Sequence, residues 1–232
     1  MKQISERVFY VGVNDDDKVL FEGLWPLPVG VSYNSYIVAD EKVALIDTVE
    51  CGFEEEFIAN IEEAIGDRQI DYLVVNHMEP DHSSLVSLML ERYPSLMIVA
   101  NAKTLPMLAG YYGVAADRVK VMAEGESLSL GSCSLSFHMI PMVHWPETMV
   151  TWLAEEGTLF SGDAFGTFGS IDDAVVDEDD TFEQYRDEMM RYYSNIVGKY
   201  GGDVDYSGQQ LLPMLIPISQ YKITRIAFTK ES

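Results

Sequence analysis

The sequence His77-Met78-Glu79-Pro80-Asp81-His82 follows an apolar, β-like run from Tyr72 to Asn76. It places four metal-capable side chains within six positions, and it uses two of the four histidines of the chain. Pro80 excludes a continuous helix through the segment, because proline lacks the amide donor and clashes with the preceding turn. In extended backbone, residues two apart lie on the same side, roughly 6.5 Å from each other. His77 and Glu79 can therefore converge on one ion, while Asp81 and His82 face a second.

The alternative interpretation of this segment is an exposed polar loop, which commonly collects Asp, Glu and Pro. Two scarce histidines among the carboxylates favour the metal site instead. Ser83 and Ser84 are expected to cap the helix that follows and so to fix the loop, because serine is a preferred N-cap residue.

Further ligands are expected from other segments of the chain. His144 lies in a short loop, Met142 to Pro146, after the β-like run that contains Phe137. Asp163 follows the apolar run Thr158 to Ser161; an aspartate beside a glycine is usually a turn residue, but here it is a candidate bridging carboxylate. His138, inside a strand, is expected to be a packed or partly exposed histidine and not a ligand.

These residues form two incomplete ligand sets that share Asp163. One set is His77, Glu79 and His144, and the other is Asp81 and His82. Imidazole and carboxylate without thiolate suit iron or manganese, and zinc less well. Two ions bridged by a carboxylate are typically about 3.5–4 Å apart.

Short runs rich in Val, Ile and Tyr, bounded by turn residues, predict many strands, and helical periodicity interleaves with them later in the chain. The predicted strands are Val8 to Val13, Val31 to Val38, Val43 to Val49, Tyr72 to Asn76, Leu96 to Ala100, Val119 to Ala123, Leu135 to Ile140, Met149 to Leu153, Thr158 to Ser161 and Ile223 to Phe228. The predicted helices are Phe53 to Ile65, Ser84 to Tyr93, Lys103 to Tyr112, Thr181 to Val197 and Gly208 to Leu215. The pattern predicts one α/β domain over residues 1–232, with two sheets between helices in an αββα four-layer sandwich.

Composition narrows the class of protein. The net charge of -23 disfavours nucleic acid and anionic lipid as partners. No stretch approaches the roughly 20 apolar residues of a membrane helix, and the acidic start gives no secretion signal. Two cysteines, Cys51 and Cys133, form no paired motif, so a reducing cytoplasm is the expected location.

These motifs resemble those of flavodiiron proteins and their stand-alone oxygen-binding di-iron relatives, a branch of the metallo-β-lactamase fold. The resemblance covers nearly the whole chain. Its segments are Tyr33 to Tyr36, Ala44 to Thr48, His77 to Ser83, His144 to Pro146, Gly162 to Gly166 and Tyr192 to Ile196. Hydrolytic members of the wider fold usually carry histidine where this chain has Glu79, so the resemblance favours the di-iron branch over the zinc hydrolases.

The resemblance implies one iron on His77, Glu79 and His144, a second on Asp81 and His82, and Asp163 as the bridge. It also implies an aromatic residue near the oxygen pocket, at Tyr192 or Tyr193, of which Tyr193 is taken as the catalytic candidate; packing of a helix face is the alternative.

Two departures from the family stand out. No histidine follows residue 144, so the family's last histidine ligand is absent; Lys230 falls in its place, and Glu231 is a possible substitute. The chain also has no flavin-binding loop, so we expect it to bind no flavin and to need a separate electron donor.

Three functions follow from this reading. The first is reduction of dioxygen or nitric oxide with electrons from a flavodoxin- or rubredoxin-like partner. The second is oxygen binding or sensing that alters contacts with a signalling protein. The third is hydrolysis by a metal-bound water, which Glu79 fits poorly. A homodimer is left open.

Overall fold

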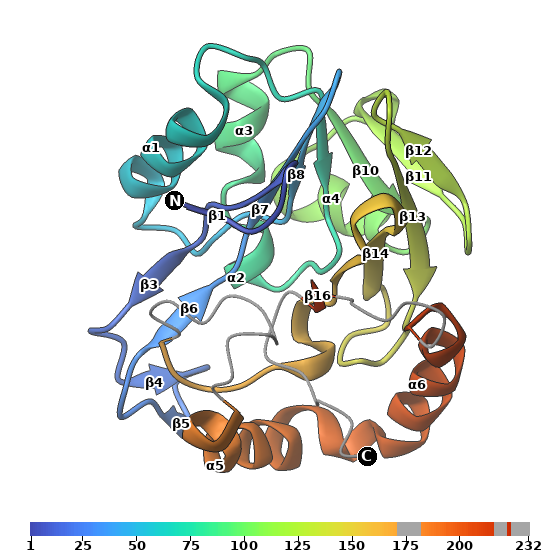
Figure 1. Cartoon of the computed structure of the whole chain (residues 1–232). Coiled ribbons are helices and arrows are strands. Elements are labelled where there is room, and N and C mark those ends of the chain that lie inside the picture. The colour runs from blue at the N-terminus through green and yellow to red at the C-terminus, as the bar shows by residue number, and fades with distance from the viewer. Residues whose placement is uncertain (171–181, 216–221, 224–232) are drawn as a thin grey trace.

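The computed structural model describes residues 1–170, 182–215 and 222–223. Its core is a pair of β-sheets with helices on their outer faces (Figure 1). The first sheet has seven strands in the order β1-β2-β7-β8-β9-β10-β11, and the second has five in the order β12-β13-β14-β15-β16. Two small antiparallel pairs, β3 with β6 and β4 with β5, lie beside them.

The strands of the first sheet are β1 (Lys2–Gln3), β2 (Val8–Tyr10), β7 (Tyr36–Ala39), β8 (Val43–Ile46), β9 (Tyr72–Val74), β10 (Met97–Asn101) and β11 (Val119–Met122). Those of the second are β12 (Ser127–Ser129), β13 (Ser134–Met139), β14 (Met149–Leu153), β15 (Thr158–Phe160) and β16 (Lys222–Ile223). The small pairs are β3 (Val13–Asp15), β4 (Leu20–Phe21), β5 (Trp25–Pro26) and β6 (Val31–Tyr33). The α-helices are α1 (Glu54–Ile65), α2 (Pro80–Ser83), α3 (Val86–Arg92), α4 (Thr104–Tyr112), α5 (Phe182–Tyr192) and α6 (Gly201–Leu215).

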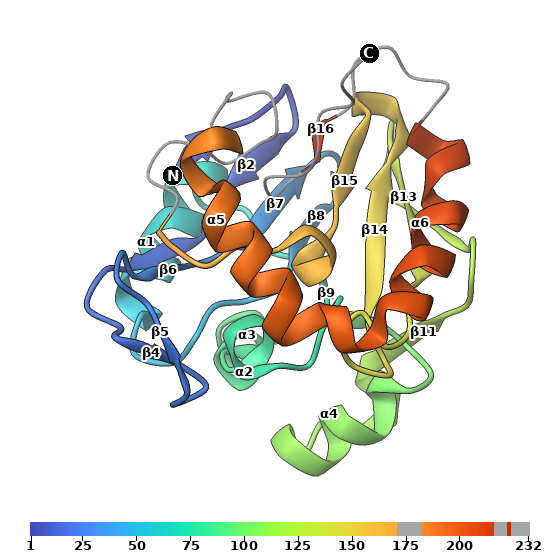
Figure 2. The ribbon, with the colours of Figure 1, turned by 90° about the horizontal axis from the view of Figure 1, so that it is seen from below.

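Alternation along β8 shows how the layers are built. Val43 and Leu45 pack in the cluster that contains Phe57 and Ile61 of α1. Ala44 and Ile46 point the other way, into the cluster shared with Phe137 and other residues of the second sheet. Successive side chains of a strand point to opposite faces, so a fully buried strand contributes side chains to two hydrophobic cores. Figure 2 shows α1 outside the first sheet and α6 outside the second. The predicted four-layer αββα sandwich is confirmed.

Two predicted strands are wrong as single strands. Val8 to Val13 is divided into β2 and β3, and Val31 to Val38 into β6 and β7. The divisions meet at Gly12, where an added Cβ would lie 2.3 Å from the carbonyl oxygen of Tyr33. The two chain segments approach closely there, which glycine permits.

The later helices also differ from the prediction. The helix that begins as α5 widens at its end, where Tyr193–Val197 form a π-helix with hydrogen bonds between residues five apart. Helix α6 begins at Gly201 rather than at residue 208. Of the predicted strand from Ile223 to Phe228, only Ile223 lies within the described residues, in β16. None of the helices in these described ranges is long and apolar enough to cross a membrane.

The double core gives a stability prediction. Leu45 is 0% exposed in β8. We expect Leu45→Ala to lower the free energy of unfolding by about 2–5 kcal/mol, because it removes buried methyl groups and leaves a cavity. Urea denaturation of the ion-free protein measures this. Leu24→Ala is the matched control, since Leu24 is 70% exposed and should change stability by less than about 0.5 kcal/mol. Equal losses in the two variants would contradict the assigned core.

Candidate metal centre

The six predicted ligands come from three places in the chain that meet at one end of the sandwich. His77, Glu79, Asp81 and His82 lie between the end of β9 and the end of α2. His144 lies in the loop between β13 and β14, and Asp163 lies in a 3-10 turn, Gly162–Phe165, after β15. In Figure 2 the segment after β15 turns toward β8 and β9. The segments that follow the strands therefore place the six predicted ligands close together.

One group of four ligand atoms is tightly gathered. The oxygen Oε2 of Glu79 lies 3.2 Å from Nε2 of His77 and 3.0 Å from Nε2 of His144. Oδ2 of Asp163 lies 3.7 Å from the same His77 nitrogen and 3.4 Å from the same His144 nitrogen. All four atoms are within 4.8 Å of one another, and all four residues are buried. The group combines two imidazoles with two carboxylates, and a set of imidazole and carboxylate facing one point is typical of non-haem Fe(II).

The second group shares Asp163 with the first. Oδ1 of Asp163 lies 3.0 Å from Nε2 of His82, and Oδ1 of Asp81 lies 3.9 Å from that nitrogen. One oxygen of Asp163 thus faces each group. This is the geometry that the bridging assignment requires, and the rings of His77 and His82 are 5.2 Å apart.

The sequence analysis did not identify two carboxylates that contact the outer ring nitrogens of His77 and His82. Oε1 of Glu147 lies 2.9 Å from Nδ1 of His77 and accepts the backbone amide of Met78 at 3.0 Å. Oδ2 of Asp47 lies 3.2 Å from Nδ1 of His82. A carboxylate on one ring nitrogen keeps the proton there, so Nε2 carries the lone pair toward an ion.

The local signal for these two residues was weak. Glu147 directly follows His144-Trp145-Pro146, and Asp47 directly follows β8. Both are ordinary acidic residues in a chain with 38 of them. Asp47 also has a φ of 55°, a conformation uncommon outside glycine, while its Oδ1 accepts the amide of Asn76 at 2.7 Å.

The expected capping by Ser83 and Ser84 is wrong. Ser83 lies inside α2, and its hydroxyl donates to the carbonyl oxygens of Met78 at 2.9 Å and Glu79 at 3.0 Å. Helix α3 starts after Leu85 without a side-chain cap. Pro80 occupies the first turn of α2, where a missing amide donor costs nothing. The proline therefore starts a short helix that turns Asp81 and His82 away from Glu79.

The cluster carries more negative than positive charge. Five carboxylates are buried together with three imidazoles, namely Asp47, Glu79, Asp81, Glu147 and Asp163 with His77, His82 and His144. No lysine or arginine within the described part of the chain is buried. Even with every imidazole protonated, the cluster would keep an excess of negative charge, and burying such charge without compensation is costly. A bound cation would supply the compensation.

The pKa values of the ion-free cluster reflect that imbalance. Burial alone would lower the pKa of His144, but Asp163 and Glu79 outweigh it and raise this pKa to about 10. Burial alone would raise the pKa of Glu79, but the nearby His144 and His77 lower it to about 2. Burial raises the pKa of Asp81 to about 6 against the opposing effect of His82. Protons on the imidazoles thus take the place of metal ions.

Two ligand atoms support a fit to metal more directly. Oδ1 of Asp81 and Nε2 of His144 are buried without a hydrogen-bond partner. The His144 nitrogen is close to Glu79 but is not aligned for a hydrogen bond, as expected for two donors that face a third point. Buried polar atoms are normally hydrogen-bonded, and nitrogen and oxygen donors without thiolate fit iron.

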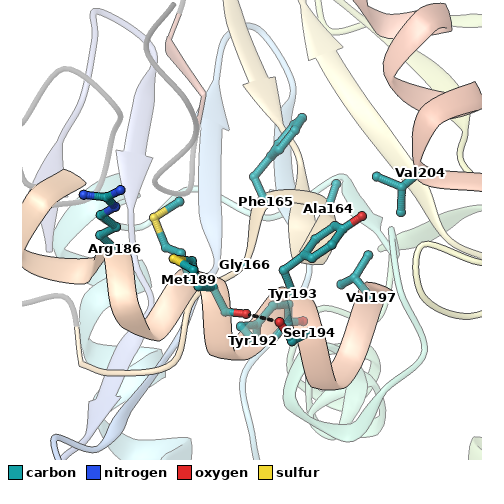
Figure 3. Close-up of a pocket in the computed structure, with 11 residues that line it drawn as sticks. Ala164, Phe165, Gly166, Arg186, Met189, Tyr192, Tyr193, Ser194, Val197 and Val204 are labelled. Carbon is teal, nitrogen blue, oxygen red and sulfur yellow. Dashed lines mark hydrogen bonds between the residues drawn. The ribbon is translucent and has the colours of Figure 1, made fainter. Parts of the chain in front are cut away.

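The other candidate residues lie outside this cluster. His138 pairs with Glu124, Nδ1 to Oε1 at 2.9 Å, in a structural role. Tyr192 is buried, with its ring 5.2 Å from that of Phe168. Tyr193 is 47% exposed and lines an apolar cavity of about 480 Å³ with Ala164, Val197 and Val204 (Figure 3). Its catalytic role stays a prediction. Lys230 and Glu231 lie outside the described residues.

The carboxylate behind His77 gives a matched test. We expect Glu147→Gln to weaken metal binding by about tenfold or more, because such outer partners typically contribute 10–100-fold to affinity. Glu124→Gln removes a carboxylate at the same distance from His138 and should leave affinity unchanged. Titration of the ion-free protein with Co(II) measures both. Identical affinities in the two variants would remove Glu147 from the site.

The raised imidazole pKa values predict proton release. At pH 7 the ion-free protein holds a proton on His144, whose pKa is about 10, and on His82, whose pKa is well above its usual value. An ion must displace these protons, so affinity should rise as pH rises, by about tenfold per pH unit for each proton displaced. Calorimetry in two buffers of different ionisation enthalpy counts the protons. Binding that weakens from roughly pH 6 to pH 8 would contradict the assignment.

Comparison with known proteins agrees with this geometry. Residues 31–199 match the ODP family beta lactamase. The anaerobic nitric oxide reductase flavorubredoxin of Vibrio vulnificus is 33% identical over 217 residues, which are 93% of this chain and 44% of that protein. The nitric oxide reductase of Moorella thermoacetica is 34% identical over 84% of this chain and 49% of its own length. The chain thus spans about half the length of these relatives.

Solved structures show the same fold. Rubredoxin oxygen:oxidoreductase from Desulfovibrio gigas has a TM-score of 0.84 and 27% identity, covering 97% of this chain and 57% of that one. A flavo di-iron protein from Thermotoga maritima has a TM-score of 0.83 and 28% identity, covering 94% of this chain and 55% of that one. Both the metallo-β-lactamase-like fold and the family resemblance are confirmed, and the chain belongs to the ODP family of beta lactamases.

Proposed function

We propose that this chain holds two iron ions and binds dioxygen or nitric oxide at them, with electrons supplied by a separate redox partner. The observation that carries the proposal is Asp163, whose two oxygens face two different groups of imidazole and carboxylate. Relatives named as nitric oxide reductases and a structural neighbour named as a rubredoxin oxygen:oxidoreductase support the same chemistry.

The residues of the chain have separate tasks in this proposal. His77, Glu79 and His144 hold one ion, Asp81 and His82 hold the other, and Asp163 bridges them. When bound, the two irons supply redox electrons and positions for a diatomic ligand. Glu147 and Asp47 keep protons on the outer ring nitrogens of His77 and His82, so that the inner nitrogens remain available.

The surroundings of the cluster keep it largely dry. His77 is fully buried, and its ring lies 5.2 Å from those of His144 and Trp145. A dry site strengthens the attraction between carboxylates and cations. Burial of the site also means that only small ligands can reach it.

An external donor follows from the electron count. Two irons that each change by one electron provide two electrons, whereas reduction of dioxygen to water takes four. A flavodoxin- or rubredoxin-like protein is the proposed donor, and the cytoplasmic location stays a prediction. Hydrolysis is less well supported, because half of the six proposed ligands are carboxylates, which suit iron better than zinc.

The test is metal content followed by turnover. We expect protein reconstituted anaerobically to hold two irons per chain and to consume dioxygen or nitric oxide when reduced rubredoxin or flavodoxin is supplied. Asp163→Asn should disturb both ions and abolish consumption, whereas His138→Ala should change neither. Stoichiometric zinc that persists after iron reconstitution would overturn the proposal. Two irons that bind dioxygen without turnover would instead support the sensing function.

A further inference from the structure

An asparagine is buried between strands β6 and β7 without a bond for its side chain. Asn34 is 7% exposed, and neither the nitrogen nor the oxygen of its side-chain amide has a hydrogen-bond partner within the described part of the chain. Buried polar atoms are normally hydrogen-bonded, and an unbonded amide is costly to bury. Asn34 belongs to the segment from Tyr33 to Tyr36 that contributes to the family resemblance, but the proposed function gives it no role.

The residue after Asn34 attaches this part of the chain to the metal centre. The hydroxyl of Ser35 donates to the backbone carbonyl oxygen of Asp47 at 2.9 Å, and both residues are buried. Asp47 in turn places Oδ2 at 3.2 Å from Nδ1 of His82. Asn34 is therefore held beside the pair formed by Asp47 and His82, which is part of the second group of proposed ligands.

A small cavity joins Asn34 to that pair. Its volume is about 10 Å³, and its walls are Asn34, Tyr36, Ile46, Asp47, Asn76, His82, Phe160 and Gly162. This is about the least space that one water molecule needs, and a buried water typically makes about three hydrogen bonds. The Nδ2 group of Asn34 can donate to such a water, and the carboxylate of Asp47 can accept from it, because a carboxylate offers about four lone pairs. The polar walls therefore favour water as the occupant.

The cavity lies on the outer side of His82, away from the ions. Nδ1 of His82 is on the side of Asp47, whereas Nε2 faces Oδ1 of Asp163 at 3.0 Å. Of the six proposed ligands, His82 alone lines the cavity. Asp81 and Asp163, which complete the second group, do not reach it. Asn34 is thus placed to act on His82 through Asp47 and not to bind the ion itself.

We propose that Asn34 holds a buried water molecule that is hydrogen-bonded to Asp47, and that it thereby positions His82 for the second ion. The inference rests on the proposed function and adds a positioning residue to it. Outer partners of a ligating histidine fix the orientation of its ring. A water molecule between Asn34 and Asp47 gives the carboxylate a partner in addition to His82 and Asn76, so its orientation, and with it that of the imidazole, is more narrowly defined.

The first measurement concerns the ion-free protein. Magnetic relaxation dispersion of water oxygen-17 counts the long-lived internal water molecules. Asn34→Leu should hold one fewer than the native chain, because the larger apolar side chain fills the cavity and offers water no partner. Asn34→Ser keeps a hydroxyl and leaves space, so it should retain the water. Asn60→Leu is the matched control: its Nδ2 group already donates to the carbonyl oxygen of Gly12 at 3.1 Å, and the count should stay native.

The second measurement follows Co(II) binding to the full chain by visible absorption. His82→Ala identifies the binding phase that belongs to the second ion. Asn34→Leu should weaken that phase by about tenfold and leave the other phase unchanged. Asn34→Ser should restore most of the affinity, and Asn60→Leu should match the native protein. Asn34→Val, a smaller apolar change, serves in both measurements if Asn34→Leu does not fold.

The outcomes separate positioning from other roles. An unchanged water count in Asn34→Leu would overturn the inference. Loss of the water with both Co(II) phases intact would overturn the positioning role, and equal weakening of both phases would show a general structural effect in its place. A native chain that binds neither Co(II) nor Fe(II) would defeat the proposed function, whereas the water count of the ion-free protein would still decide whether Asn34 holds the water.

Discussion

Excess negative charge at one end of the β-sandwich is the constraint on which this structure depends. Five carboxylates are buried there with only three imidazoles, and the raised pKa values of the histidines show how strongly the cluster attracts positive charge. A fold that buries such charge gains nothing from it in stability, because desolvation opposes it. The cluster is therefore best understood as a site held ready for cations, with the rest of the sandwich supplying rigidity.

That rigidity comes from hydrogen bonds that connect the two sheets next to the ligands. Asn76 receives a bond from Thr151 of β14 at 2.7 Å and donates its amide to Asp47, so one residue connects β14 with the carboxylate behind His82. The Nδ2 group of Asn101, at the end of β10, donates to the carbonyl oxygen of Glu147 at 2.5 Å. Polar networks of this kind orient side chains more narrowly than apolar packing does. The positions of the His77 and His82 imidazoles are thus set by both sheets together.

The sequence alone predicted the fold class and the residues that gather as candidate ligands. It did not predict every residue that positions them. The segment from His77 to His82 is visible because it concentrates rare residues, and His144 and Asp163 are visible because each follows a β-like run. Asp47 and Glu147 could not be distinguished from other acidic residues, since only the register of β8 with β9 and the path of the β13–β14 loop bring them behind the histidines. The division of Val31 to Val38 into two strands was equally hidden, because it depends on Gly12, which is remote in sequence.

The matched family region also clarifies which parts of the site belong together. Residues 31–199 contain all six proposed ligands and both carboxylates behind the histidines. These eight residues lie at strand ends, in the short segments that follow them and on the short helix α2, so the packing of the two sheets brings them together.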